Sequence, residues 1–136
     1  MVKLIIMCKR KTGLSREEFI SHWKNVHASL ARQDASFWSR VRGFTQYYGL
    51  PDVGLPAAVG VSADKPWDGV VELWFDNAAE MNAAFSGEET VRVLVADHDN
   101  FVDSGSLISV LTEENVIAPR SAPPAESGPR KAHMAT

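Results

Sequence analysis

Residues 69–76 form the clearest predicted strand of the sequence, and this strand is apolar on both of its faces. Successive side chains of a strand point to opposite sides. Here one side carries Val71, Leu73 and Phe75, and the other carries Val70, Glu72 and Trp74. A sheet built around such a strand needs apolar cover on both sides. A chain of 136 residues can cover one side with its own helices, so we expect a homodimer in which the other side packs against a second copy.

The remaining elements predict an α+β fold with a single four-stranded antiparallel sheet. Predicted strands cover residues 2–8, 44–50, 69–76 and 107–112. The predicted helices are a long one over residues 16–33, with a break at 34–36 before an apolar patch that reaches Val41, and two shorter ones that begin at Asn77 and Ser86. The order β-α-β-β-α(α)-β is the ferredoxin-like pattern, in which the helices lie on one face of the sheet.

The first predicted helix carries two histidines beside its apolar stripe. Ser15 and Glu18 form a capping box at its start, where each side chain accepts a hydrogen bond from the other residue's amide. The stripe itself consists of Phe19, Trp23, Val26 and Leu30. At about 100° per residue, His22 and His27 lie on opposite margins of this stripe. Partial burial shifts a histidine pKa easily, so each is either a titrating site residue or a boundary histidine bonded to a neighbour.

The composition is that of an ordinary globular domain, with 45% hydrophobic and 23% charged residues. A net charge of −3 argues against nucleic-acid binding, and no apolar run is long enough to span a membrane. Cys8 is the only cysteine, which excludes an internal disulfide, and it is predicted to be a core residue in a reducing compartment. A strand that begins at residue 2 leaves no room for a signal peptide, so we expect a cytoplasmic protein.

Two segments lack a regular pattern. Residues 50–67 contain prolines and glycines, yet they hold too many apolar side chains for a solvated linker. A flap over a pocket or a partner subunit is one interpretation, and a plain mobile loop is the other. Residues 118–136 are rich in proline, alanine and serine and are predicted to be disordered. The folded domain is therefore predicted to cover residues 1–117.

Four segments resemble the EthD family in the same order along the chain. They are MVKLIIMCKRKTGLSREEFISHWKNVHASL at residues 1–30, DGVVELWFDNAAEM at 68–81, ADHDNFVD at 96–103 and TEENVI at 112–117. The resemblance implies a dimeric α/β barrel made from ferredoxin-like subunits. It also implies a small enzyme that acts on polyketides or aromatic compounds, often without a cofactor. His27 ends the W-x-x-x-H segment shared with the family, which implies that this histidine is important.

No motif in the sequence specifies a bound cofactor or metal. There is no phosphate-binding glycine loop, no Cys-x-x-Cys pair and no nucleophile elbow. His22 and His27 diverge around an α-helix and are not expected to share one ion. Asp97, His98 and Asp99 are consecutive in a predicted polar turn, and such residues rarely converge on a cation. We therefore expect a hydrophobic small-molecule substrate and no cofactor.

The predicted site is an aromatic cavity that contains titratable side chains. His27 is the expected general base, with Tyr47 or Asp97 orienting it or the substrate, and Glu72 completes the catalytic set. The predicted substrate-binding residues are His22, Trp23, Trp67, Trp74, Phe85 and His98. Two of these assignments have structural alternatives. Glu72 could instead form a buried salt bridge, and Tyr47 could be a packing residue with a satisfied hydroxyl.

Such a site suits proton transfer in a reactive substrate, and several functions remain open. The first is cofactor-independent cyclisation, dehydration, decarboxylation or isomerisation of a polyketide-like or aromatic compound. A close variant is cofactor-free oxygenation of a phenol or anthrone, in which the substrate carbanion itself reacts with oxygen. A second class is a non-catalytic protein that binds a hydrophobic metabolite or supports a partner oxidase. Haem ligation by a histidine, known elsewhere in the superfamily, is a third.

Overall fold

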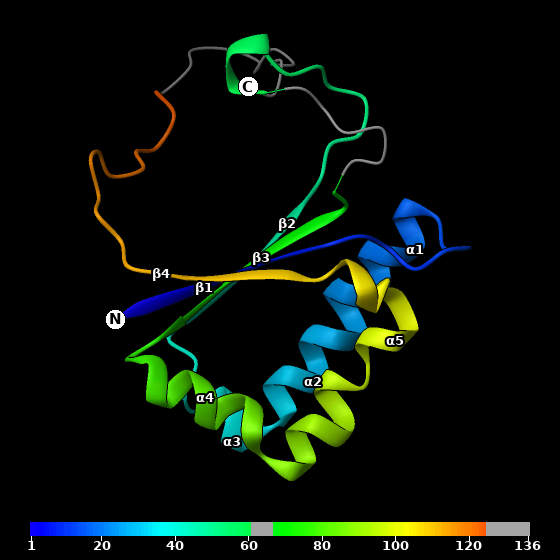
Figure 1. Ribbon diagram of the computed structural model, residues 1–136, viewed down its shortest axis with the longest axis vertical. Helices are drawn as coiled ribbons and strands as arrows, with labels where there is room; N and C mark the ends of the chain where they lie inside the picture. Colours follow the sequence, from blue (N-terminus) through cyan, green and yellow to red (C-terminus); the bar gives the residue numbers. More distant parts are fainter. Residues whose placement is uncertain (61–66, 125–136) are drawn as a thin grey trace.

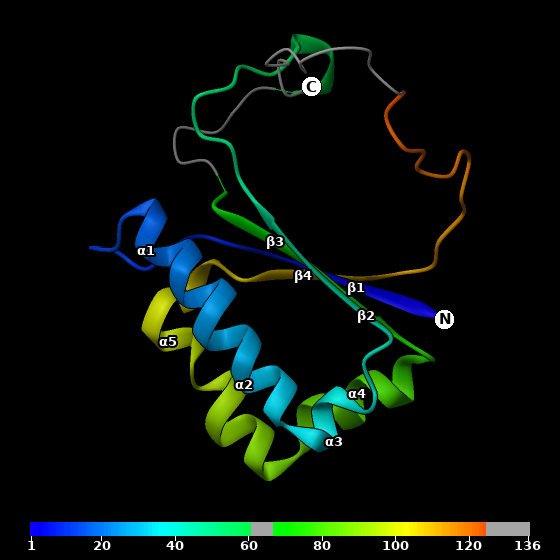
Figure 2. The same cartoon turned by 180° about the vertical axis from the view of Figure 1, so that it is seen from behind.

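The computed structural model describes residues 1–60 and 67–124, and it contains a four-stranded antiparallel sheet with helices on one face (Figures 1 and 2). The strands are β1 (Val2–Cys8), β2 (Gly43–Tyr48), β3 (Gly69–Phe75) and β4 (Ile108–Thr112). Their spatial order is β2-β3-β1-β4, so the first and third strands occupy the centre. This arrangement confirms the predicted ferredoxin-like α+β class.

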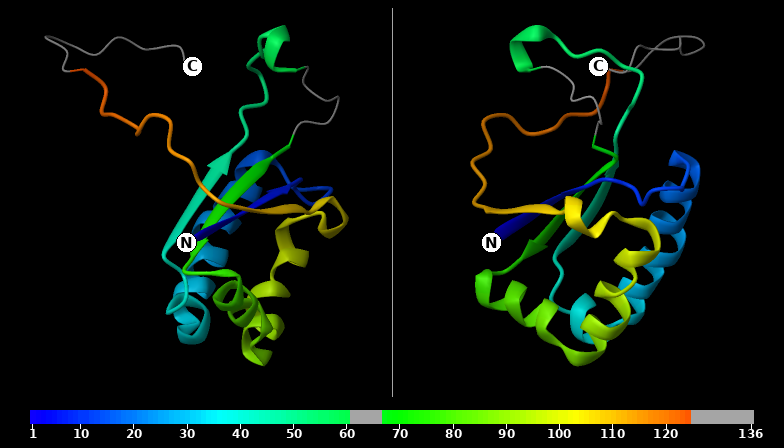
Figure 3. Two further views of the ribbon diagram at one scale, coloured as in Figure 1. Left: turned by 60° about the vertical axis from the view of Figure 1, so that its left-hand side comes forward. Right: turned by 45° about the vertical axis from the view of Figure 1, so that its right-hand side comes forward.

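The strand register divides the sheet into two apolar faces. Ile6 pairs with Val71, and Phe44 pairs with Leu73. These side chains face the helices, as do Leu4 and Phe75, and they pack into the core. The opposite face carries Ile5, Tyr47, Val70, Trp74, Ile108 and Val110. No helix of the described residues covers that face, while residues 49–60 and 113–124 rise on its side (Figure 3). The predicted two-sided apolar sheet is therefore present, with one side open in the single chain.

The first helix is continuous from Arg16 to Gln33 but changes its winding in the middle. It consists of α1 (Arg16–Ser21), a π-helical segment (His22–His27) and α2 (Ala28–Gln33). Both hydrogen bonds of the predicted capping box are present between Ser15 and Glu18. Asp34 then leaves the helical conformation, and its side chain accepts a hydrogen bond from the Phe37 amide to start α3 (Ala35–Trp38). The predicted break is confirmed.

The π-helical segment moves the buried stripe by one residue. A π turn closes hydrogen bonds between residues five apart, and here the Ala28 amide donates to the Trp23 carbonyl. As a result His27 and Ala28 are buried, whereas the Val26 side chain is 45% exposed. The prediction that Val26 faces the core is wrong, because it assumed an unbroken α-helical period.

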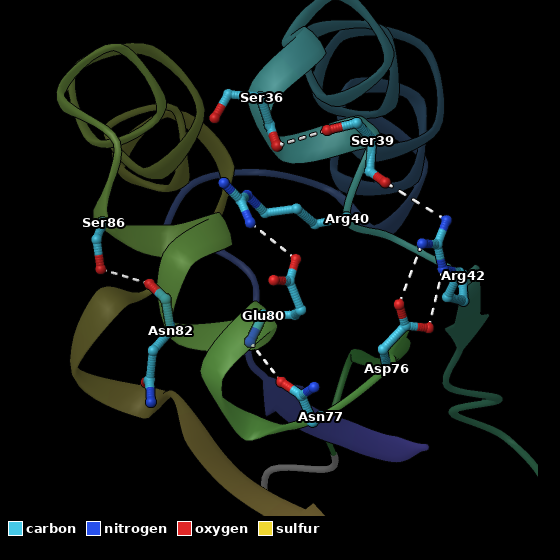
Figure 4. A network of polar contacts seen from close by, with 9 residues as sticks. All are labelled: Ser36, Ser39, Arg40, Arg42, Asp76, Asn77, Glu80, Asn82 and Ser86. Atoms are coloured by element: carbon cyan, nitrogen blue, oxygen red, sulfur yellow. Dashed lines mark hydrogen bonds and ion pairs between the residues drawn. The ribbon is translucent and has the colours of Figure 1, made fainter.

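A network of ion pairs joins the start of α4 (Ala78–Ser86) to the segment between α3 and β2 (Figure 4). The Asn77 side chain accepts a hydrogen bond from the Glu80 amide, which confirms the predicted cap. Arg40 donates to the Glu80 carboxylate at 2.7 Å, and Arg42 pairs with Asp76 through two contacts of 3.0 and 3.1 Å. These contacts fix the start of α4 against the segment that leads into β2.

The chain after α4 carries a second π-helical segment, Thr90–Val95, followed by the short helix α5 (His98–Phe101). The Ser86 hydroxyl donates back to the Asn82 carbonyl, so its predicted role as the cap of a new helix is wrong (Figure 4). Asp97 lies at the junction of the π segment and α5 and is buried. The predicted polar turn at residues 97–101 is wrong in part, because the turn ends at Asp97 and residues 98–101 form α5.

Two clusters of side chains form the core between helices and sheet. One contains Ala31, Phe37, Leu73, Phe75, Ala84 and Leu94, and the other contains Cys8, Phe19, Trp23, Phe101 and Val102. Cys8 is buried as predicted, and burial raises its pKa to about 12. None of the described helices is long and apolar enough to cross a bilayer.

The two segments without a regular pattern are described only in part. Residues 50–60 are exposed and contain one short 3₁₀ turn, Ala57–Val59. Residues 61–66 of the predicted flap and residues 125–136 of the predicted disordered tail lie outside the described residues. The interpretation of both segments stays a prediction.

Candidate active site

Two side chains from opposite halves of the chain meet beneath the sheet. His27 Nδ1 lies 2.8 Å from Asp97 Oδ2, and both residues are only 6% exposed. His27 closes the first π-helical segment, and Asp97 follows the second. The structure therefore brings two of the predicted site residues, His27 and Asp97, into direct contact.

The same carboxylate binds a second histidine and an amide. His22 Nε2 lies 2.9 Å from Asp97 Oδ1 and 3.0 Å from Oδ2, and Asn100 Nδ2 donates to Oδ1 at 2.9 Å. The prediction that His22 and His27 diverge is wrong. Residues five apart lie nearly one above the other in a π turn, so both imidazoles point toward the same partner.

The electrostatics of this group favour an ionised carboxylate and a neutral base. Burial by itself raises the pKa of Asp97, but hydrogen bonds from Asn100, His22 and His27 outweigh it, and the net pKa is lowered. Burial lowers the pKa of His27 to about 4, against the opposing effect of the Asp97 hydrogen bond. An ionised carboxylate only accepts hydrogen bonds. The proton of neutral His27 therefore lies on Nδ1, and the lone pair lies on Nε2.

The His27 ring also lines a small cavity between the helices and the sheet. The cavity volume is about 50 Å³, which is room for about four water molecules. His27 Nε2 has no hydrogen-bond partner within residues 1–60 and 67–124. Most of the lining is apolar or aromatic and includes Trp23, Phe37, Phe44, Phe85, Leu94 and Phe101. A neutral imidazole with an unpartnered Nε2 among the described residues thus lines a largely apolar cavity.

Three of the predicted binding residues share this cavity with His27. They are Trp23, Phe85 and His98. The Trp23 ring packs closely on β3, because a Cβ atom at Gly69 would lie 2.6 Å from its ring. Trp67 instead lies beneath the Lys9 ammonium, 4.9 Å from the ring centroid, at the start of β3. It does not belong to the described lining of the cavity.

The prediction of a single cavity that includes Glu72 and Tyr47 is wrong. Both residues lie on the open face of the sheet, on the side away from His27. The Tyr47 hydroxyl donates to Glu72 at 3.1 Å, and Lys3 pairs with the same carboxylate at 3.3 Å while lying over the Trp74 ring. Tyr47 therefore cannot orient His27. The structural alternative for Glu72, an ion pair across the sheet, is the arrangement observed.

Sequence reasoning missed three residues that build the site. Asn100 is one helical turn after Asp97, and this spacing of three residues could have predicted the contact between their side chains. Phe101 packs against both histidines, with ring centroids 5.0 Å from His22 and 5.0 Å from His27. Gln46 in β2 donates to the Trp23 carbonyl at 3.1 Å, and no local pattern predicts that contact.

The described part of the chain contains no cluster of three or more His, Cys, Asp or Glu side chains that could hold a metal ion. Cys8 also lines the cavity, but with its pKa near 12 the thiol stays protonated. The group His22–Asp97–His27 therefore offers acid–base chemistry, with Nε2 of His27 as the ring nitrogen that has no partner among the described residues.

Comparisons with known proteins identify a family and a fold that this chain shares. The sequence model of the EthD domain matches residues 11–105. The crystal structure of an EthD family protein from Bacillus halodurans aligns with a TM-score of 0.60 and 24% identity, covering 85% of this chain and 99% of that one. A comparison with the curated proteins gave no match.

Two further solved structures share the fold at lower identity. A dimeric protein of unknown function with a ferredoxin-like fold from Bacteroides fragilis has a TM-score of 0.58 and 16% identity, with coverages of 83% and 95%. A hydroxynitrile lyase from Passiflora edulis has a TM-score of 0.54 and 16% identity, with coverages of 87% and 96%. At these identities the similarity establishes the fold alone.

Proposed function

The chain belongs to the EthD family, and we propose that it is a small cofactor-independent enzyme that moves a proton in a polyketide-like or aromatic substrate. His27 is the general base, and Asp97 orients it. The reactions that such a base supports are cyclisation, dehydration, decarboxylation and isomerisation, since each can proceed through an enolate or phenolate.

One observation carries this proposal: a buried carboxylate holds His27 at Nδ1, Nε2 has no partner among the described residues, and the imidazole lines an apolar cavity. Because the pKa of His27 is about 4, the imidazole is in its basic form at neutral pH. When Nε2 takes a proton, the Asp97 carboxylate, which lies 2.8 Å from Nδ1, stabilises the resulting imidazolium. The His22 and Asn100 contacts keep the carboxylate in place during this change.

The dimensions of the cavity limit what reacts there. A space of about 50 Å³ is smaller than the roughly 150 Å³ cavity in which benzene binds, so only a small reacting group, such as a carbonyl with its α-carbon, enters and the remainder of the substrate stays outside. Aromatic walls such as Trp23 and Phe85 favour a flat, apolar group.

We also propose that the open face of the sheet is the surface of a homodimer. Ile108 and Val110 are 55% and 53% exposed there, and they are continuous with Ile5, Met7 and Trp74 in the strand register. A similar fold from Bacteroides fragilis is described as dimeric, which supports this assembly. A second copy of the face would remove these side chains from water.

Cofactor-free oxygenation begins with the same proton abstraction and is the second candidate. A phenol or anthrone that loses its proton to His27 becomes an electron-rich anion that reacts directly with oxygen. The apolar cavity favours this course as well, because it excludes bulk water from the anion. Oxygen consumption during turnover distinguishes the two reactions.

The test uses 5-nitro-1,2-benzisoxazole, whose ring opens to a coloured phenolate when a base removes its C–H proton. We expect wild-type protein to accelerate the reaction and His27→Gln to lower the rate about 100-fold or more. Gln33→Ala, on the exposed end of α2, is the control and leaves the rate unchanged. An equal rate in the wild type and His27→Gln overturns the proposal. Retained binding of the probe by His27→Gln separates loss of chemistry from loss of the site.

A further inference from the structure

A second imidazole borders the cavity beside His27 and makes no hydrogen bond within the described residues. His98 is the first residue of α5, and its ring centroid lies 5.0 Å from that of His27, with the two planes inclined by 32°. Both rings line the same cavity. The side chain is also in contact with Phe101, at 6.1 Å between ring centroids, which restricts its orientation.

We propose that His98 is a catalytic residue that donates a hydrogen bond to the oxyanion formed when His27 removes a proton. The substrate class is then narrower than an aromatic or polyketide compound in general. It is a compound whose acidic C–H or O–H lies within two bonds of an oxygen that takes the negative charge, as in an enolisable ketone or a phenol. This inference rests on the proposed function of His27 as the base.

The geometry suits a base and a hydrogen-bond donor that act on one substrate, because the rings of His27 and His98 are neighbours. In an enolisable ketone the α-carbon and the carbonyl oxygen are separated by two bonds. Two imidazoles whose ring centroids are 5.0 Å apart can therefore contact both atoms at once, His27 the α-carbon and His98 the carbonyl oxygen. The proton moves from the α-carbon to His27 Nε2, and the electron pair of the C–H bond moves into the enolate. His98 keeps its own proton and shares it with the enolate oxygen.

The electrostatic setting keeps His98 a neutral donor. Burial lowers its pKa, and the nearby carboxylates of Asp97 and Asp99 only partly oppose that effect. His27, on the first helix, faces the His98 ring and is itself neutral. Cys8 in the same cavity is a protonated thiol. A neutral imidazole does not repel the imidazolium that forms on His27. A donor in a dry site also stabilises an anion more strongly than it would in water.

Two variants separate hydrogen-bond donation from simple packing. His98→Phe keeps a ring but removes the donor, and His98→Gln keeps an N–H donor but removes the ring. Asp99→Asn is the matched control, since Asp99 is an exposed neighbour whose side chain accepts a hydrogen bond from Ser104. Thermal unfolding of each variant shows that the fold is retained.

The first measurement is elimination of 5-nitro-1,2-benzisoxazole, in which negative charge develops on the phenolate oxygen. We expect His98→Phe to lower kcat about 10- to 100-fold with KM little changed, because the donor acts mainly as the charge develops. His98→Gln should keep most of the rate, and Asp99→Asn should keep all of it. A wild-type kcat in His98→Phe, or an equal loss in His98→Gln, overturns the assignment.

The second measurement does not depend on turnover. 4-Nitrophenol is titrated into each protein, and the absorbance of its ionised form reports the affinity for the phenolate. We expect His98→Phe to weaken phenolate binding about tenfold relative to wild type and His98→Gln. If His27→Gln leaves elimination unchanged, the proposed function fails. If His27→Gln abolishes elimination and His98→Phe alters neither rate nor binding, only the inference about His98 fails.

Discussion

His22 and His27 are five residues apart on one helix, yet both imidazoles contact the single carboxylate of Asp97. An α-helix would place them about 140° apart, at 100° per residue. The π-helical winding of His22–His27 brings them to the same side, and it exchanges Val26 for His27 in the buried stripe. π segments often occur at functional sites. Here one of them assembles the candidate site.

The buried base should give the protein an acid-sensitive stability. The folded-state pKa of His27 is about 4 and its ordinary value is 6.5. As the pH falls below 6.5 the unfolded chain takes up this proton before the folded chain does. The stability contribution is therefore complete above pH 6.5 and is lost as the pH falls to about 4, a total of about 3 kcal/mol. Urea unfolding at several pH values measures the loss. If His27→Gln shows the same decline between pH 6.5 and 4, His27 is not its source.

Replacement of Asp97 should destabilise the fold as well as the site. In Asp97→Asn an NH2 donor replaces one carboxylate oxygen, so the single amide oxygen that remains cannot accept all the hydrogen bonds that the carboxylate takes from His22, His27 and Asn100. We expect a loss of about 1–3 kcal/mol in the free energy of unfolding, measured by urea denaturation. The exposed carboxylate of Asp99 provides the control, and Asp99→Asn should change stability by less than about 0.5 kcal/mol. Equal losses in the two variants would contradict this account.

Gly69 should be required for the packing of Trp23 against β3. A Cβ atom at residue 69 would lie 2.6 Å from the Trp23 ring and 3.2 Å from Cys8 Sγ. We expect Gly69→Ala to lower the free energy of unfolding by about 1–3 kcal/mol, because the ring must move out of a packed core. Gly54→Ala is the control, since nothing lies within 4 Å of a Cβ there. Thermal unfolding compares the two, and an unchanged Tm in Gly69→Ala contradicts the prediction.

Gln46 should support the π-helical turn from the neighbouring strand. Its amide donates to the Trp23 carbonyl at 3.1 Å, and its carbonyl accepts from the Tyr48 hydroxyl at 2.8 Å. We expect Gln46→Leu to cost about 1 kcal/mol of stability and to shift the imidazole NMR signals of His27. Thr45→Val, an exposed change on the other face of β2, should leave those signals in place. Unmoved signals in Gln46→Leu would show that the turn does not need this support.

The proposed dimer should depend on the open face of the sheet. Val110 is 53% exposed on this face, and Val91 is 47% exposed on the helical side. Val110→Lys places a charge in the proposed interface, which is costly unless the charge is paired. We expect this variant to be monomeric in light scattering at a concentration where the wild type and Val91→Lys are dimeric. A monomeric wild type, or a dimeric Val110→Lys, would contradict the proposed interface.

Much of the fold follows from local patterns. Alternation in residues 69–76 predicts β3 and its two faces, and the residues at 15, 18 and 77 predict the helix starts that are observed. The prediction failed where a helix departs from the α period, as at Val26, and where a side chain was assigned to the wrong side of the sheet, as at Glu72. Periodicity states which residues share a face, but it does not state which face the helices cover.

The sequence by itself determined the element order and the fold class, because these depend on neighbours along the chain. Only the tertiary structure decided that Asp97 is the partner of His27, since the two residues are separated by 70 positions. It likewise decided that His98, and not Tyr47 or Glu72, shares the cavity with His27. Such contacts depend on how two π-helical segments pack against one sheet, and no local pattern specifies that packing.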